Sequence, residues 1–94
     1  MKSVLQYIKE NPDAFMGAAE ARSHTTPSHT NMMNHQRLVG YIHSENWYEV
    51  EKLITDEFYY KPLMGVVMVA DDSYGLDSDD WFGAYDAYKA GNIS

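Results

Sequence analysis

The sequence contains no cysteine and only 7 lysines and arginines in 94 residues. Without cysteine, neither a disulfide framework nor a metal site built from thiolates can form. The scarcity of cations argues against direct binding of nucleic acid, because neutralising phosphates requires clustered lysine and arginine. We therefore expect no nucleic acid among the direct partners of this chain.

A long hydrophobic run is also missing. The longest apolar segment, LMGVVMVA at 63–70, has eight residues, whereas a membrane-spanning helix needs about 20. The first residues, MKSVLQYIKENP, lack the apolar run and the cleavage site of a signal peptide. From these features we expect a soluble, cytoplasmic protein that does not bind membranes.

Motifs for catalysis or cofactor binding are absent as well. The sequence has no GxSxG motif and no glycine-rich phosphate loop. An EF-hand loop beginning at Asp71 would place Phe82 where calcium needs a carboxylate, and the other registers also fail. We expect no catalytic residue, no cofactor and no metal ion.

The four histidines lie at positions 24, 29, 35 and 43 and offer no metal-binding pair. No two of them have the i, i+4 spacing that places two imidazoles on one face of a helix. His24 and His29 lie in the polar segment 23–30, where a flexible metal site with a carboxylate stays open as an alternative. We expect His35 to be a partly buried helix residue and His43 to complement a helix dipole.

The sequence does contain enough apolar material for one small core. Apolar residues make up 45% of the chain and aromatic residues 14%. Because this length is too short for two cores, residues 1–94 are predicted to form a single acidic domain. Residues 45–94 hold eleven of the 14 acids and three of the 7 cations, and such an acidic half attracts basic partners.

Helix signals begin at the N-terminus. A capping box predicts a short helix over about 3–10. Asn11 followed by Pro12 predicts the start of a second helix, which ends near Arg22. Residues 23–30 are polar and contain a proline, so they are predicted to form a loop or the prelude to the next helix.

An αα-hairpin is predicted in the middle of the chain. Apolar residues recur at helical spacing from about Pro27 to His43, where a pair Thr26–Pro27 supplies the starting signal. Residues 44–46 interrupt the pattern, and a capping box starts a further helix over 47–58. Two helices joined by so short a turn are expected to pack back to back. The apolar side of the second helix is predicted to contain Trp47, Val50, Ile54 and Phe58.

The segment 58–70 is compatible with two structures. Its valines favour a strand, but a strand would need a partner, which only FYY at 58–60 could supply. We favour a buried helix that starts at Pro62. The predicted fold class is therefore all-α, with four to five short helices around an αα-hairpin, and the alternative is α+β with a small hairpin near residues 58–70.

The segment DDSYGLDSDDWFGAYDAY at 71–88 combines six aspartates with five aromatic residues. A helix is predicted from about Asp79 to Ala90, because aspartates in its first turn and a lysine in its last turn match the helix dipole. Trp81, Tyr85 and Tyr88 would share one face of this helix. Asp71, Asp72 and Asp77 are expected on a loop before it.

Two interpretations of this segment stay open. In one, the rings dock the last helix on the core and the aspartates are merely solvated. In the other, the rings and carboxylates form a partner-binding surface, since tyrosine and tryptophan dominate interface energetics. The residues predicted to bind a partner are Asp71, Asp72, Tyr74, Asp77, Asp79, Asp80, Trp81, Tyr85 and Asp86.

The functional hypothesis follows from the second interpretation. We expect a non-enzymatic binding module or inhibitor that presents an acidic, aromatic surface to a basic partner, such as a nucleic-acid-binding protein. Carboxylates at spacings comparable to those of phosphates would make it a nucleic-acid mimic. Compact acidic inhibitors of this kind are typical of phages and mobile elements. The alternative is a structural or assembly subunit of a homo-oligomer or virion.

Overall fold

The computed structural model describes residues 4–74, and residues 1–3 and 75–94 lie outside the described part. Helices make up nearly all of this part, and no strand occurs between residues 4 and 74. The predicted all-α fold is confirmed, and the alternative hairpin near residues 58–70 is wrong because these residues are helical. The elements are α1 (Val4–Glu10), α2 (Pro12–Thr25), α3 (His29–His43), α4 (Trp47–Ile54), the 3-10 turn η1 (Glu57–Tyr59) and α5 (Tyr60–Tyr74).

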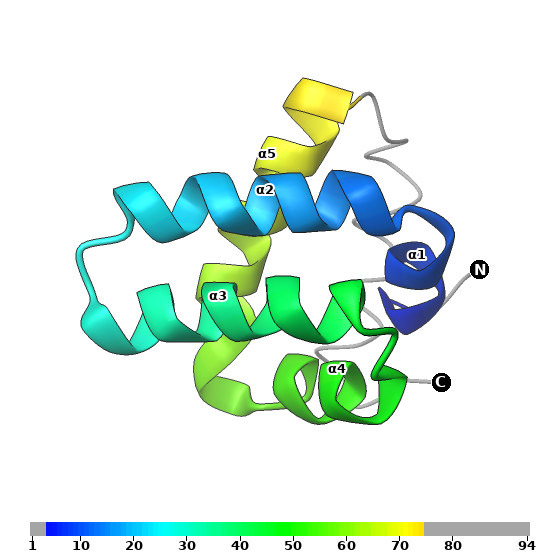
Figure 1. Cartoon of the computed structure of the whole chain (residues 1–94). Coiled ribbons are helices and arrows are strands. Elements are labelled where there is room, and N and C mark those ends of the chain that lie inside the picture. The colour runs from blue at the N-terminus through cyan, green and yellow to red at the C-terminus, as the bar shows by residue number, and fades with distance from the viewer. Residues whose placement is uncertain (1–3, 75–94) are drawn as a thin grey trace.

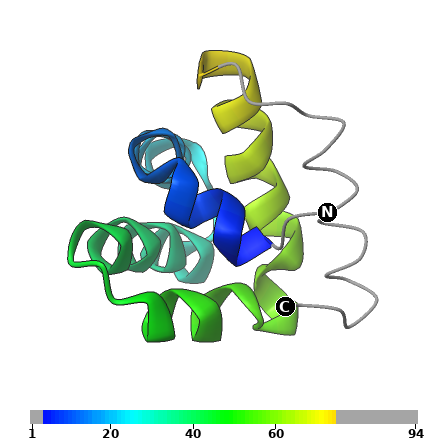
Figure 2. The same cartoon turned by 90° about the vertical axis from the view of Figure 1, so that its right-hand side faces the viewer.

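The described helices form two layers. α2 and α3 run antiparallel and side by side, and they make the most extensive helix–helix contact (Figure 1). Figure 2 shows α5 on one side of this pair, running steeply across it, and α5 packs against α2. α1 contacts α2 and α4 at one end of the pair. The α2–α3 pair is therefore the platform on which the other helices are arranged.

The predicted packing of α4 on α3 is present, but the longer hairpin is α2–α3. α4 packs against α3 across the turn at residues 44–46. α4 has only 8 residues against the 15 of α3, so it cannot pair with α3 along its whole length. α2, with 14 residues, matches α3 in length and takes that position.

The connection between α2 and α3 is shorter than the predicted loop at 23–30. α2 continues to Thr25, where Thr26 closes the helix by donating from Oγ1 to the Arg22 carbonyl at 2.6 Å. Ser28 begins α3 by accepting at Oγ from the Asn31 backbone N–H at 3.3 Å. Ser28 is thus the cap of α3, and the prediction that Thr26 and Pro27 start this helix is wrong by two residues.

α4 begins where the sequence predicted and ends earlier. Oδ1 of Asn46 accepts a backbone N–H of the first turn at 3.4 Å, as expected for a capping residue. After Ile54 the chain turns, and Oδ1 of Asp56 accepts the Phe58 N–H at 2.9 Å. This turn leaves Phe58 81% exposed and Tyr59 fully buried. The prediction that Phe58 faces the core is therefore wrong, and Tyr59 occupies the core instead.

α5 extends over residues that were predicted as a loop. It starts at Tyr60 rather than at Pro62, and it continues through Asp71 and Asp72 to its last residue, Tyr74. The placement of both aspartates on a loop is wrong. The helix continues because its apolar residues keep helical spacing, which buries one face completely. These buried residues are Leu63, Val66, Val67 and Ala70.

The core is apolar except for two side chains. Its largest fully buried members include Phe15 of α2, Leu38 of α3 and Tyr59 of η1. Ser23 and His35 are the buried polar residues of the described part, with 4% and 0% of their surfaces exposed. His35 was expected to be partly buried, and it is fully buried. Among the described helices, none is long and apolar enough to cross a membrane.

Candidate functional site

The residues predicted to bind a partner fall mostly outside the described part of the chain. Asp71, Asp72 and Tyr74 lie near the end of α5, where Asp72 is exposed. The end of a helix carries a partial negative charge, so aspartates there add to an already negative region. The predicted residues that lie outside residues 4–74 are Asp77, Asp79, Asp80, Trp81, Tyr85 and Asp86.

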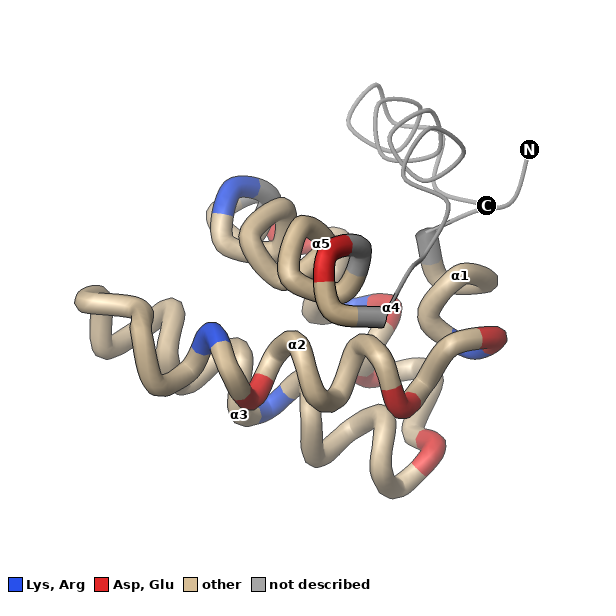
Figure 3. Tube along the Cα trace, turned by 90° about the horizontal axis from the view of Figure 1, so that it is seen from above, with Lys and Arg blue, Asp and Glu red and all other residues tan. Residues whose placement is uncertain are grey.

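The acids of the described residues are distributed over several helices. Figure 3 shows Asp and Glu positions on α1, α2 and α5 as well as beside α4. On the α3–α4 seam, a cavity of about 260 Å³ places Glu49 and Asp56 together with Arg37 and Lys52. Charges of both signs are therefore mixed at this seam, and Lys52 also lies on the other side of α4, beside Glu51.

That other side carries large exposed rings. Tyr48 is 74% exposed, and Phe58, just after α4, is 81% exposed. Tyr48, Glu51, Lys52 and Thr55 line a shallow cavity of about 240 Å³, so a ring and a carboxylate lie next to each other. We call these four residues, together with Phe58, the α4 surface. Sequence reasoning missed it because Phe58 was placed in the core and Tyr48 was not singled out.

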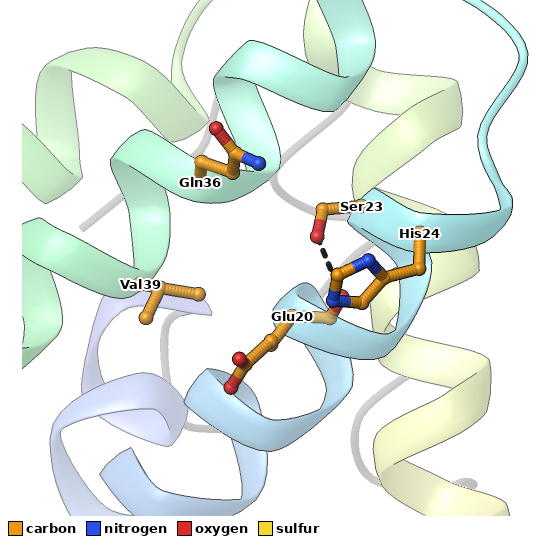
Figure 4. Close-up of a pocket in the computed structure, with 5 residues that line it drawn as sticks. All are labelled: Glu20, Ser23, His24, Gln36 and Val39. Atoms are coloured by element: carbon orange, nitrogen blue, oxygen red, sulfur yellow. Dashed lines mark hydrogen bonds between the residues drawn. The ribbon is translucent and has the colours of Figure 1, made fainter.

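A smaller pocket of about 160 Å³ lies in the groove between α2 and α3. Glu20, Ser23 and His24 line it from α2, and Gln36 and Val39 face them from α3 (Figure 4). Ser23 and His24 were expected on a loop, and both belong to the last two turns of α2. They therefore have fixed positions on a helix rather than positions on a flexible segment.

This groove does not hold an activated nucleophile. The hydroxyl of Ser23 donates to the carbonyl of Glu20 at 2.6 Å, so its proton is engaged by the backbone and not by His24 (Figure 4). An activated serine needs a base within hydrogen-bond reach of its hydroxyl. Between residues 4 and 74, no group of three or more histidine and acidic side chains is placed to hold a metal ion.

The most unusual polar contact joins α3 to η1. Nδ1 of His35 lies 2.8 Å from the hydroxyl of Tyr59, and both side chains are fully buried. The two ring centroids are 5.5 Å apart. Nε2 of His35 is buried and has no hydrogen-bond partner among the described residues. A buried polar atom without a partner is rare in proteins and needs an explanation.

The surroundings of this pair keep both rings neutral. Burial, together with the smaller effect of the nearby guanidinium of Arg22, lowers the pKa of His35 to about 4. Burial also raises the pKa of Tyr59 well above its usual value. Near neutral pH, His35 therefore carries a single ring proton and Tyr59 keeps its hydroxyl proton.

Sequence reasoning did not identify this cluster. Its signal was an arginine on an apolar stripe, since Arg22 follows Phe15, Ala18 and Ala19 at helical spacing. Such a cation must either leave the core or meet a polar group there. The buried polar side chain near Arg22 is His35, which also lies on the apolar stripe of its own helix.

Comparisons with known proteins add no functional information. No known protein family matches this chain, and no similar protein was found among the curated proteins or the solved structures.

Proposed function

We propose that this chain is a non-enzymatic protein-binding domain that presents acidic and aromatic residues to a basic surface of a partner protein. The observation that supports it best is the α4 surface, where the exposed ring of Tyr48 lies beside Glu51 and Lys52, and where Phe58 is exposed in the turn after α4. Exposed aromatic rings bury a large area on binding at low entropic cost. Carboxylates beside them would steer the encounter with a basic partner.

The acidic residues between 71 and 86 belong to the same proposal. They give the second half of the chain its excess of negative charge, within a net charge of −7 for the whole. A groove lined with lysine and arginine is the matching partner chemistry, as in proteins that bind nucleic acid. The domain would then act by occupying that groove as an inhibitor.

The test begins with the untagged protein as bait in a lysate of its host, followed by mass spectrometry of the captured partner. With the purified partner, the Kd is measured calorimetrically between 50 and 500 mM salt. We expect the Kd to rise about tenfold or more over this range, because salt screens attraction between exposed charges. A Kd that does not change with salt would contradict electrostatic recognition.

Variants locate the surface. Tyr48→Ala combined with Phe58→Ala should weaken binding by about tenfold or more if these rings are hot spots. Asp79→Lys combined with Asp80→Lys should abolish binding while the circular dichroism spectrum stays unchanged. Asp13→Lys, an exposed acid of α2, is the control for a charge reversal elsewhere. Equal losses for the acidic variants and this control would mean that net charge, and not a defined surface, governs binding.

Sedimentation of the free protein tests the alternative role in assembly. A monomer is expected for a domain that binds a different protein. A stable oligomer without any partner would instead favour a structural subunit, with Tyr48, Phe58 and the 53%-exposed Met68 as candidate contacts between copies.

A further inference from the structure

A cavity beside the buried histidine has an unusual charge for so acidic a chain. It measures about 240 Å³ and lies where the α2–α3 connection, the first turn of α3 and the start of α5 meet. Arg22 and Lys61 line it, and among the described residues no aspartate or glutamate does. The cavity on the α3–α4 seam, by contrast, contains cations and acids together. Cations held in a cavity without any carboxylate favour an anion from outside the cavity.

Arg22 packs against α5 at this cavity. Nε of Arg22 is buried and has no hydrogen-bond partner in the described part of the chain. Its guanidinium lies flat against α5, because a Cβ built on Gly65 would be 3.0 Å from Nε and 3.1 Å from Nη2. A larger residue at position 65 would force the Arg22 side chain to shift, because the guanidinium lies against Gly65.

His35 offers a second polar group to the cavity. It lines the cavity although it is fully buried, and its Nδ1 is already engaged by Tyr59. Nε2 is the ring nitrogen that remains, and no described residue pairs with it. We assign the Tyr59 hydroxyl as the donor to Nδ1, because a phenol is the stronger donor of the two groups. The ring proton then resides on Nε2, which makes this atom a hydrogen-bond donor.

The start of α3 adds further donors. Ser28, the cap of this 15-residue helix, and Asn31 both line the cavity. Oγ of Ser28 already accepts the backbone N–H of Asn31, so these two residues offer their side-chain groups at a helix start that carries a partial positive charge. Arg22, Lys61 and His35 thus line one space together with a helix start, and this combination is typical of sites for oxyanions.

We propose that this cavity is a binding site for a small oxyanion, a carboxylate or phosphate group, held by Arg22, Lys61, Nε2 of His35 and the side chains of Ser28 and Asn31 at the start of α3. Its volume is below the range of about 300–1,000 Å³ for drug-sized ligands, so the ligand is a small molecule or one anionic group of a larger one. The site shares no residue with the α4 surface, so the test of anion binding is independent of the test of partner binding.

The test is a titration of the full chain with inorganic phosphate, with sodium chloride adjusted to keep the ionic strength constant at pH 7.5. The signals followed are the ring nitrogens of His35 in NMR spectra. We expect a saturable change with a midpoint in the millimolar range, which is typical of small anions held by a few charge-assisted hydrogen bonds. A parallel titration with acetate separates the two ligand classes: the anion that saturates at lower concentration identifies the preferred group.

Two matched pairs of variants locate the binding. Arg22→Gln should raise the midpoint about tenfold, whereas Arg37→Gln, on the exposed side of α3, should leave it within about twofold. Lys61→Gln and the exposed Lys52→Gln form the second pair, with a smaller expected difference. If Arg22→Gln does not fold, as judged by circular dichroism, the lysine pair decides.

Two results would overturn the site. One is a His35 signal that shifts without saturation up to about 50 mM of both anions, which would leave only water or screening ions in the cavity. The other is an equal loss of affinity in the members of each pair, which would mean that the ions respond to overall charge. A saturable change whose midpoint rises in Arg22→Gln or Lys61→Gln, but not in the matched exposed control, supports the site.

Discussion

At the scale of single residues, the buried contact between His35 and Tyr59 links α3 to the turn after α4. The 2.8 Å bond spans 24 positions of the chain, so it holds the end of α4 against the core. Since Nδ1 accepts the Tyr59 hydroxyl in this bond, protonating the ring would place a proton on Nδ1 and remove this acceptor. The histidine is therefore both a structural element and a source of sensitivity to acid.

This contact predicts a loss of stability in mild acid. The folded pKa of His35 is about 4, below its ordinary value of 6.5. Above pH 6.5 the ring is neutral in both the folded and the unfolded chain, and its contribution to stability is complete. As the pH falls from 6.5 towards 4, the unfolded chain takes up a proton that the folded chain excludes. The free energy of unfolding should drop by about 2 kcal/mol between pH 7.5 and pH 5 from this source.

Urea denaturation at both pH values measures the change. His35→Gln removes the ionisable ring and should give a smaller drop than the wild-type chain, even if it is less stable at pH 7.5. His43→Gln, at the exposed end of α3, is the control and should give a drop at least as large as that of the wild-type chain. A wild-type chain and a His35→Gln variant with the same pH dependence would contradict the prediction.

At the scale of elements, the turn between α3 and α4 contains a strained residue. Glu45 has a φ of 56°, and it is exposed. This left-handed conformation is unfavourable for a residue with a Cβ and is readily adopted by glycine. Glu45 retains this conformation because the chain must turn here so that the next residue, Asn46, can cap α4.

Glu45→Gly should therefore stabilise the protein, by about 1 kcal/mol, because relief of the left-handed strain exceeds the entropy that glycine adds to the unfolded chain. Ser44→Gly in the same turn is the matched control. Ser44 has a φ of −87° and donates from Oγ to the Gly40 carbonyl at 2.9 Å, so glycine there should destabilise. Thermal unfolding of both variants checks the signs, and two shifts of equal sign would contradict the assignment of strain to Glu45.

The beginnings of α2 and α4 were predictable from the sequence, whereas the ends of these two helices were not. Asn46 starts α4 through a contact with its own first turn, so the signal lies within a few adjacent residues. The end of α4 depends on Tyr59 reaching His35 across the core, and no local pattern encodes such a contact. For this reason Phe58 was placed in the core and Tyr59 was not.

The same distinction holds for the candidate sites. The excess of acid in the second half of the chain is a property of composition and was visible at once. The cationic cavity was not, because Arg22, His35 and Lys61 belong to three different segments that only the packing of α5 across α2 brings together. A lone arginine on an apolar stripe was the one local sign of it.

At the scale of the whole molecule, the net charge of −7 predicts how stability responds to salt. Like charges repel more strongly in the compact state than in the unfolded chain, and salt screens this repulsion. We expect the Tm to rise by about 2–4 °C between 20 and 300 mM sodium chloride, which corresponds to roughly 0.5 kcal/mol for a domain of this size.

A variant with three exposed acids neutralised, Asp13→Asn, Glu20→Gln and Glu51→Gln, should show a rise about half as large, because the repulsion grows with the net charge.

Phosphate separates this general effect from the anion site. At equal ionic strength it screens as chloride does, so any additional rise in Tm measures binding to the folded state alone. That additional rise should disappear in Arg22→Gln and persist in the triple variant. A Tm that falls on addition of sodium chloride would show instead that attraction between opposite charges, and not repulsion, dominates the electrostatics of this fold.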